Sequence, residues 1–119
     1  MKRMMTLLGV VAVLPLAAAA ANDYPTQDRV EYVFQCMHDH GGENYTTLYQ
    51  CSCSMDYIAD HLKYDDYVVA DTFTRGANAM GERGSIFREI PEARPMRNQL
   101  AQLKAEAAQR CFAPQVSGR

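Results

Sequence analysis

Four cysteines constrain the fold of this 119-residue chain more than any other feature of its sequence. They are Cys36, Cys51, Cys53 and Cys111. An even number of cysteines in a small chain that leaves the cytoplasm predicts two disulfides. The CSC stretch at residues 51–53 raises a second question, because soft-metal and redox sites also use closely spaced cysteines.

The first 21 residues predict that the chain is exported. Lys2 and Arg3 precede an apolar run that ends in alanines, with an Ala-x-Ala cleavage site before Asn22. This is the layout of a secretory signal peptide, and the run is short for a retained membrane anchor. We expect a periplasmic or secreted chain without stable membrane insertion once the signal is removed. The predicted divisions are a cleaved signal peptide at 1–21, a helical domain at 22–112 and a flexible tail at 113–119.

The charge of the chain argues against nucleic-acid binding. Without Lys2 and Arg3, the chain has 10 Lys or Arg and 14 Asp or Glu residues, a net charge of −4. General nucleic-acid binders present a basic surface. Residues 22–74 carry a net charge of −8 and residues 75–119 a net charge of +4. Either the two halves attract each other within one fold, or each presents a charged face to a partner.

Hydrophobic periodicity predicts an all-α fold, a small disulfide-linked bundle of three to four helices. Glycines at 41 and 42 end the first helix, and the short connection makes the first two helices an antiparallel hairpin. Residues 80–95 are expected to form an irregular connector, because glycine and proline interrupt them. The expected helices are about 26–40, about 44–62, one beginning at Asp65 or Asp66, and about 95–111.

Apolar residues spaced three and four apart predict which helix faces are buried. On the first helix this face is Val30, Val33, Phe34 and Met37. On the second it is Leu48, Cys51, Met55, Ile58 and Leu62. On the last it is Met96, Leu100, Leu103 and Ala107.

Helical geometry separates the two sulfurs of the CSC stretch. Cys36 and Cys51 lie at similar distances from the predicted turn, so they are expected to face each other across the hairpin. Cys53 lies about 200° further around its helix than Cys51, towards another element. The preferred pairing is therefore Cys36–Cys51 with Cys53–Cys111. Two alternatives stay open: 36–53 with 51–111, and 36–111 with 51–53.

A copper or other soft-metal site is the main alternative use of these residues, because thiolate, thioether and imidazole groups suit Cu(I). Against it, methionines on apolar helix faces usually fill the core, and histidines two residues apart diverge on a helix. A redox-active Cys-x-Cys is a third, less favoured hypothesis. The candidate ligands are Cys36, Met37, His38, His40, Cys51, Cys53 and Met55.

No nucleophile, zinc-protease or nucleotide-binding motif is present in the sequence, so we expect no enzyme activity and no cofactor. The stretch GERGSIFRE combines turn-forming glycines with Arg83, Ile86, Phe87 and Arg88. The apolar pair either closes one end of the bundle, or the four residues form a docking loop for a protein partner or anionic ligand.

Five motifs distributed over nearly the whole exported part of the chain carry a resemblance to a known group. They are YPTQDRVEYVFQCM, YQCSCSMDYIA, KYDDYV, GERGSIFR and the CF at residues 111–112. Together they resemble a family of small exported four-cysteine helical proteins of proteobacteria. The resemblance implies an accessory role beside periplasmic quinoprotein alcohol dehydrogenases and c-type cytochromes, and it implies no catalytic residue. We therefore expect a non-enzymatic periplasmic accessory or binding protein with a periplasmic protein partner.

Overall fold

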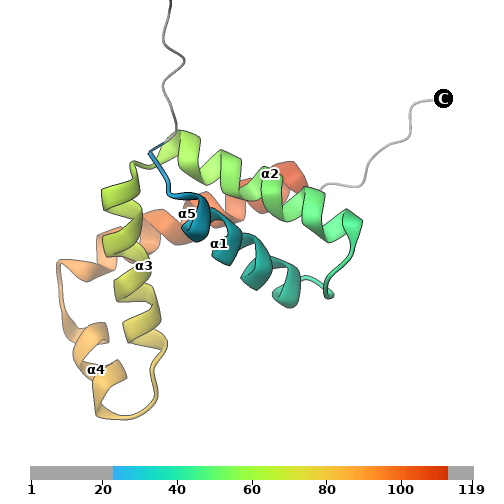
Figure 1. Cartoon of the computed structure of the whole chain (residues 1–119). Helices are drawn as coiled ribbons and strands as arrows, with labels where there is room; N and C mark the ends of the chain where they lie inside the picture. Colours follow the sequence, from blue (N-terminus) through green and yellow to red (C-terminus); the bar gives the residue numbers. More distant parts are fainter. Residues whose placement is uncertain (1–22, 113–119) are drawn as a thin grey trace, which may run out of the picture.

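The computed structural model describes residues 23–112, and this part of the chain forms five α-helices and no strand (Figure 1). The predicted all-α, disulfide-linked fold is therefore confirmed for these residues. The predicted signal peptide and C-terminal tail lie outside them. The helices are α1 (Thr26–Asp39), α2 (Tyr45–His61), α3 (Tyr64–Asn78), α4 (Glu82–Glu89) and α5 (Ala93–Cys111).

The predicted hairpin of α1 and α2 is formed by a glycine turn and a strong helix cap. Gly41 and Gly42 have φ angles of +104° and +98°, a region that side chains disfavour. The Gly42 amide donates a 2.8 Å hydrogen bond to the Met37 carbonyl. The Asn44 side chain then accepts a 3.0 Å hydrogen bond from the Thr47 amide at the start of α2. These contacts satisfy backbone groups that both helix ends would otherwise leave unpaired.

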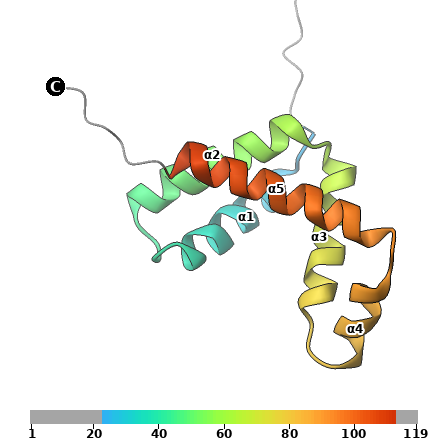
Figure 2. The same cartoon turned by 180° about the vertical axis from the view of Figure 1, so that it is seen from behind.

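The centre of the fold is the pair α2 and α5, which pack against each other and cross in both views (Figures 1 and 2). Helix α1 packs on α2, while α3 packs against α5 and projects away from it together with α4. The main core is built from side chains of α2, α3 and α5, together with a leucine that follows α2 and a tyrosine that precedes α1. Its buried members are Tyr24, Met55, Ile58, Leu62, Tyr67, Ala70, Leu100, Leu103 and Ala107.

The predicted irregular connector at 80–95 is wrong for residues 82–89, which form α4. Its local sequence contains glycine and serine, which form helices poorly. Tertiary contacts compensate: Arg88 Nη1 donates a 2.8 Å hydrogen bond to the Ala77 carbonyl, and Phe87 meets Phe73 edge-on with ring centroids 6.3 Å apart. Gly84 is buried against the Ala79 carbonyl, at a place where a Cβ atom would overlap it.

Two helix starts also differ from their predicted positions. α3 begins at Tyr64, so the predicted cap residues Asp65 and Asp66 lie in its first turn. The Tyr64 amide at this helix start donates a 3.1 Å hydrogen bond to Asp23 Oδ2. α5 begins at Ala93, so Pro95 lies in its first turn, where proline is tolerated.

Candidate functional site

The two disulfides join the helices in the pairing that the sequence favours. Cys36 of α1 is bonded to Cys51 of α2, and Cys53 of α2 to Cys111 at the end of α5. The Cα atoms are 5.8 Å apart in each pair. α2 is thus covalently linked to both of its neighbours. Disulfides of this kind are compatible with a location outside the cytoplasm.

The candidate copper ligands are not brought together as a free set in this oxidised structure. All four cysteine sulfurs are in disulfides, and Met37 and Met55 are buried in the core. His38 is exposed and contacts Asp39 at 3.3 Å, whereas the His40 ring lies against the Phe112 ring in a tilted arrangement with centroids 4.3 Å apart. Over residues 23–112, no group of three or more His, Cys, Asp or Glu side chains has the arrangement of a metal site.

The predicted docking residues 83–88 lie on α4 and divide into two kinds. Phe87 points inward, against Phe73 of α3, and Arg88 is hydrogen-bonded to the α3 backbone. Arg83 and Ile86 face solvent, with Ile86 61% exposed. Arg88 is also exposed, although its Nη1 is engaged, so Phe87 is the least accessible of the four residues, and the docking role of all four stays a prediction.

A more extended apolar surface lies between α1 and α2. Met37 and Met55 are buried at its base, and three less buried side chains line it: Val30 is 45% exposed, Phe34 55% and Leu48 38%. Together they line a groove with a volume of about 550 Å³. Hereafter, the α1–α2 groove means the hollow bounded by these five residues, with Val33, Thr26, Ser52, Arg29 and Asp56.

The two helices that bound the α1–α2 groove carry a net negative charge. Arg29 of α1 is ion-paired with Asp56 of α2, and both residues line the groove, so the pair bridges its two helices. Between residues 26 and 61 the chain has six Asp or Glu residues and one basic residue, Arg29, a net charge of −5 with histidines neutral. The lining of the groove thus carries one pair of opposite charges that neutralise each other, whereas the two helices that bound it are acidic as a whole.

The spacing of apolar residues predicts that Val30, Phe34 and Leu48 are buried, and this prediction is wrong for all three. The helical period correctly identifies the apolar side of α1, but only Val33 and Met37 find partners there. α1 packs mainly on α2, so the outer half of its apolar face stays uncovered. An apolar face on a helix at the edge of a bundle is the signal that identifies such a groove.

Comparison with family models, curated proteins and solved structures finds no match. The resemblance to small exported four-cysteine proteins therefore stays untested. None of the five described helices is both long enough and apolar enough to cross a bilayer.

Proposed function

We propose that this chain is a non-enzymatic binding protein of the periplasm, and that its partner protein docks a basic amphipathic helix into the α1–α2 groove. The observation that carries the proposal is the row of half-exposed apolar side chains Val30, Phe34 and Leu48 along a hollow with an apolar base. Large exposed apolar patches on soluble proteins commonly mark interaction surfaces.

The shape of the groove favours a helix as its occupant. Two antiparallel helices leave a groove parallel to their axes, and an amphipathic helix lays its apolar face into such a groove. Burying one large apolar side chain contributes about 1.5–3 kcal/mol, so two or three anchors supply useful affinity. The Cys36–Cys51 disulfide holds the two groove helices together, which lowers the ordering cost of binding.

The net charge of the two groove helices favours a basic partner. The net charge of −5 between residues 26 and 61 attracts Lys and Arg and repels an acidic helix. The region after residue 75 carries a net positive charge, so a second copy of this chain is the principal competing occupant, and the test below distinguishes it.

Site-specific photo-cross-linking in the exporting cell tests this proposal against the α4 alternative. A photoreactive phenylalanine replaces Phe34 in one strain and Ile86 in another; the two native residues are 55% and 61% exposed. We expect position 34 to capture one protein and mass spectrometry to locate the link in a basic amphipathic helix. Cross-links from position 86 alone, links to a second copy of this chain, or no link from position 34 would each overturn the proposal.

A charge introduced into the groove provides the second arm of the test. Val30→Asp should abolish the cross-link from position 34, because the aspartate places an uncompensated charge in the apolar contact. Val69→Asp on α3 is the matched control, since Val69 is 38% exposed and lies outside the groove. Both variants are checked for native circular dichroism, so that loss of fold is separated from loss of binding.

Copper handling by the cysteines needs free thiolates, whereas a thiol-redox protein needs a disulfide that is readily reduced. Thiol counting on the non-reduced protein, with metal analysis of the same sample, therefore separates the copper alternative from the binding proposal. We expect no free thiol and no bound copper. Two free thiols with stoichiometric copper would favour the metal function instead.

A further inference from the structure

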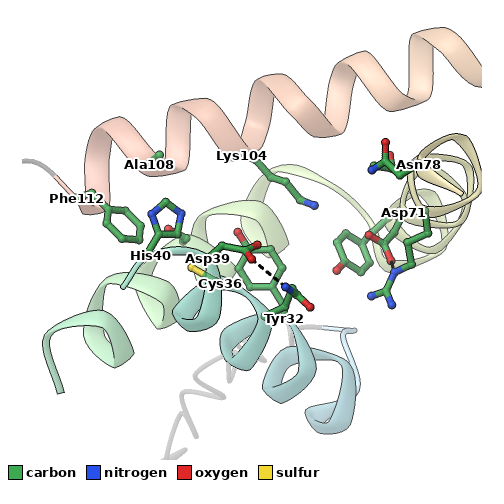
Figure 3. A pocket seen from close by; sticks show the side chains of 14 residues that line it. Tyr32, Cys36, Asp39, His40, Asp71, Asn78, Lys104, Ala108 and Phe112 are labelled. Carbon is green, nitrogen blue, oxygen red and sulfur yellow. Dashed lines mark hydrogen bonds and ion pairs between the residues drawn. The ribbon is translucent and has the colours of Figure 1, made fainter. Parts of the chain in front are cut away.

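A second, polar cavity lies among α1, α2, α3 and α5, with a volume of about 370 Å³ (Figure 3). It shares no lining residue with the α1–α2 groove. Tyr32, Lys104 and Phe112 contribute to its walls, so it combines aromatic surface with a cation. Most of its lining residues lie on these four helices.

Lys104 is the central charged group of this cavity. Figure 3 shows its side chain leaving α5 and pointing between α1 and α3, and its Nζ lies 5.8 Å from the centroid of the Tyr32 ring. Burial lowers the pKa of Lys104 from its ordinary value, and the Asp71 carboxylate opposes this shift. The ammonium is therefore partly removed from water and lies over the face of an aromatic ring.

The carboxylates that face Lys104 are already engaged with other groups. Asp71 accepts a 2.6 Å hydrogen bond from Arg75 Nε on its own helix. Asp39 accepts a 3.0 Å hydrogen bond from Gln35 and also contacts His38. Among residues 23–112 no ion pair joins Lys104 to an acidic side chain. The cavity thus holds a positive charge that no described acid neutralises by direct contact.

A buried hydroxyl group belongs to the same cavity lining. Ser54 of α2 is 2% exposed, and its Oγ has no hydrogen-bond partner in the described part of the chain. A buried polar atom without a partner is uncommon in a folded protein and calls for a specific explanation. A bound ligand that accepts a hydrogen bond from this hydroxyl provides one.

We propose that this cavity binds a small monocarboxylate with an apolar body. Its carboxylate accepts hydrogen bonds from Lys104 Nζ and Ser54 Oγ, and its body lies beside the rings of Tyr32 and Phe112. A phosphate dianion fits less well. Two cationic side chains line the cavity, Arg75 and Lys104, and in the described structure Arg75 is already paired with Asp71, so only Lys104 is left without an acidic partner. The proposal is independent of the partner helix in the α1–α2 groove.

Titration of the disulfide-bonded protein with benzoate, followed by NMR of its lysine side chains, tests the proposal. Only Lys63 and Lys104 lie beyond the predicted signal peptide, so the two signals are readily assigned. We expect benzoate to shift the Lys104 signal and raise the pKa of its ammonium, because the carboxylate stabilises the charged form. Benzamide, a neutral molecule of the same shape, should bind at least about tenfold more weakly.

Two variants and one control define the site. Lys104→Met keeps the length of the side chain but removes its charge, and should weaken benzoate binding at least about tenfold. Ser54→Ala should weaken it about three- to tenfold. Lys63→Met removes an exposed lysine outside the cavity and should leave the affinity unchanged. Circular dichroism confirms that each variant is folded.

Three results would overturn the proposal. One is no benzoate-dependent shift of Lys104 at about 10 mM, where a site with a Kd of about 1 mM is nine-tenths filled. Another is equal affinity for benzoate and benzamide. The third is equal affinity of the wild type and Lys104→Met, which would place the binding elsewhere on the protein.

Discussion

The ring of Phe87 lies directly over the backbone of Gly76, where a Cβ atom built on the glycine would come within 2.5 Å of the ring. This contact joins α4 to α3 and explains why residues 82–89 form a helix despite their weak local preference. It also means that Phe87 acts within the fold, whereas its neighbour Ile86 faces solvent.

Gly76→Ala should therefore destabilise the protein by about 1–3 kcal/mol, because the added methyl group displaces the Phe87 ring. In a Phe87→Ala background the same change should instead be neutral or stabilise by up to about 1 kcal/mol, since alanine is the better helix former. Urea unfolding of all four proteins measures this double-mutant cycle. Additive effects of the two substitutions would show that the ring does not constrain residue 76.

The two disulfides should stabilise the protein unequally. They close loops of 15 and 58 residues, and on a loop-entropy basis these contribute about 3 and about 4 kcal/mol. We expect Cys53→Ala/Cys111→Ala to lose more unfolding free energy than Cys36→Ala/Cys51→Ala. The measurement is chemical denaturation under non-reducing conditions. The reverse order would show that contacts around the α1–α2 disulfide outweigh loop length.

Ile58 is fully buried in the main core, and Ile86 on α4 provides a matched exposed isoleucine. Ile58→Ala should cost about 2–5 kcal/mol, because it removes buried apolar atoms and leaves a cavity. Ile86→Ala should change stability by less than about 0.5 kcal/mol. Thermal and urea unfolding compare the two variants, and a similar loss at both positions would contradict the described core.

Alkaline unfolding should depend on Tyr67. Burial raises the pKa of this tyrosine above its ordinary value of 10.0, with Asp71 adding to the shift and Arg75 opposing it. Above about pH 10 the unfolded chain releases a proton that the folded protein retains, so the stability present below that pH is lost as pH rises. Tyr67→Phe should move the midpoint of alkaline unfolding to a higher pH, and circular dichroism measured against pH follows this transition.

Tyr49→Phe is the control for this prediction, because Tyr49 is largely exposed. The buried Tyr24 and the partly buried Tyr32 also have raised pKa values, the latter at about 12, so some alkaline sensitivity should persist in Tyr67→Phe. An equal shift in both phenylalanine variants would show that burial of Tyr67 does not set the midpoint.

The core of the bundle could be predicted from the sequence to a large extent. The apolar period of α5 correctly identified Leu100, Leu103 and Ala107 as buried. The angular separation of Cys51 and Cys53 on one helix correctly assigned them to different neighbours. Both predictions depend on the geometry of a single helix, which repeats every 3.6 residues whatever surrounds it.

The candidate site could not be predicted in the same way. The α1–α2 groove exists because no described element covers the outer side of Val30 and Phe34. The polar cavity exists because α5 brings Lys104 opposite Tyr32, residues 72 positions apart in the sequence. Neither relationship has a local signature, since each depends on how two helices pack.

By itself, the sequence determined the all-α class and the hairpin of α1 and α2, because local periodicity and a glycine turn specify them, and it favoured one of the three possible pairings of the four cysteines. Only the tertiary structure decided that residues 82–89 form a helix, that the apolar face of α1 is left half open, and that a lysine lies in a polar cavity. The physical reason is that helical periodicity tells which side of a helix is apolar, whereas the arrangement of the other helices decides what covers that side.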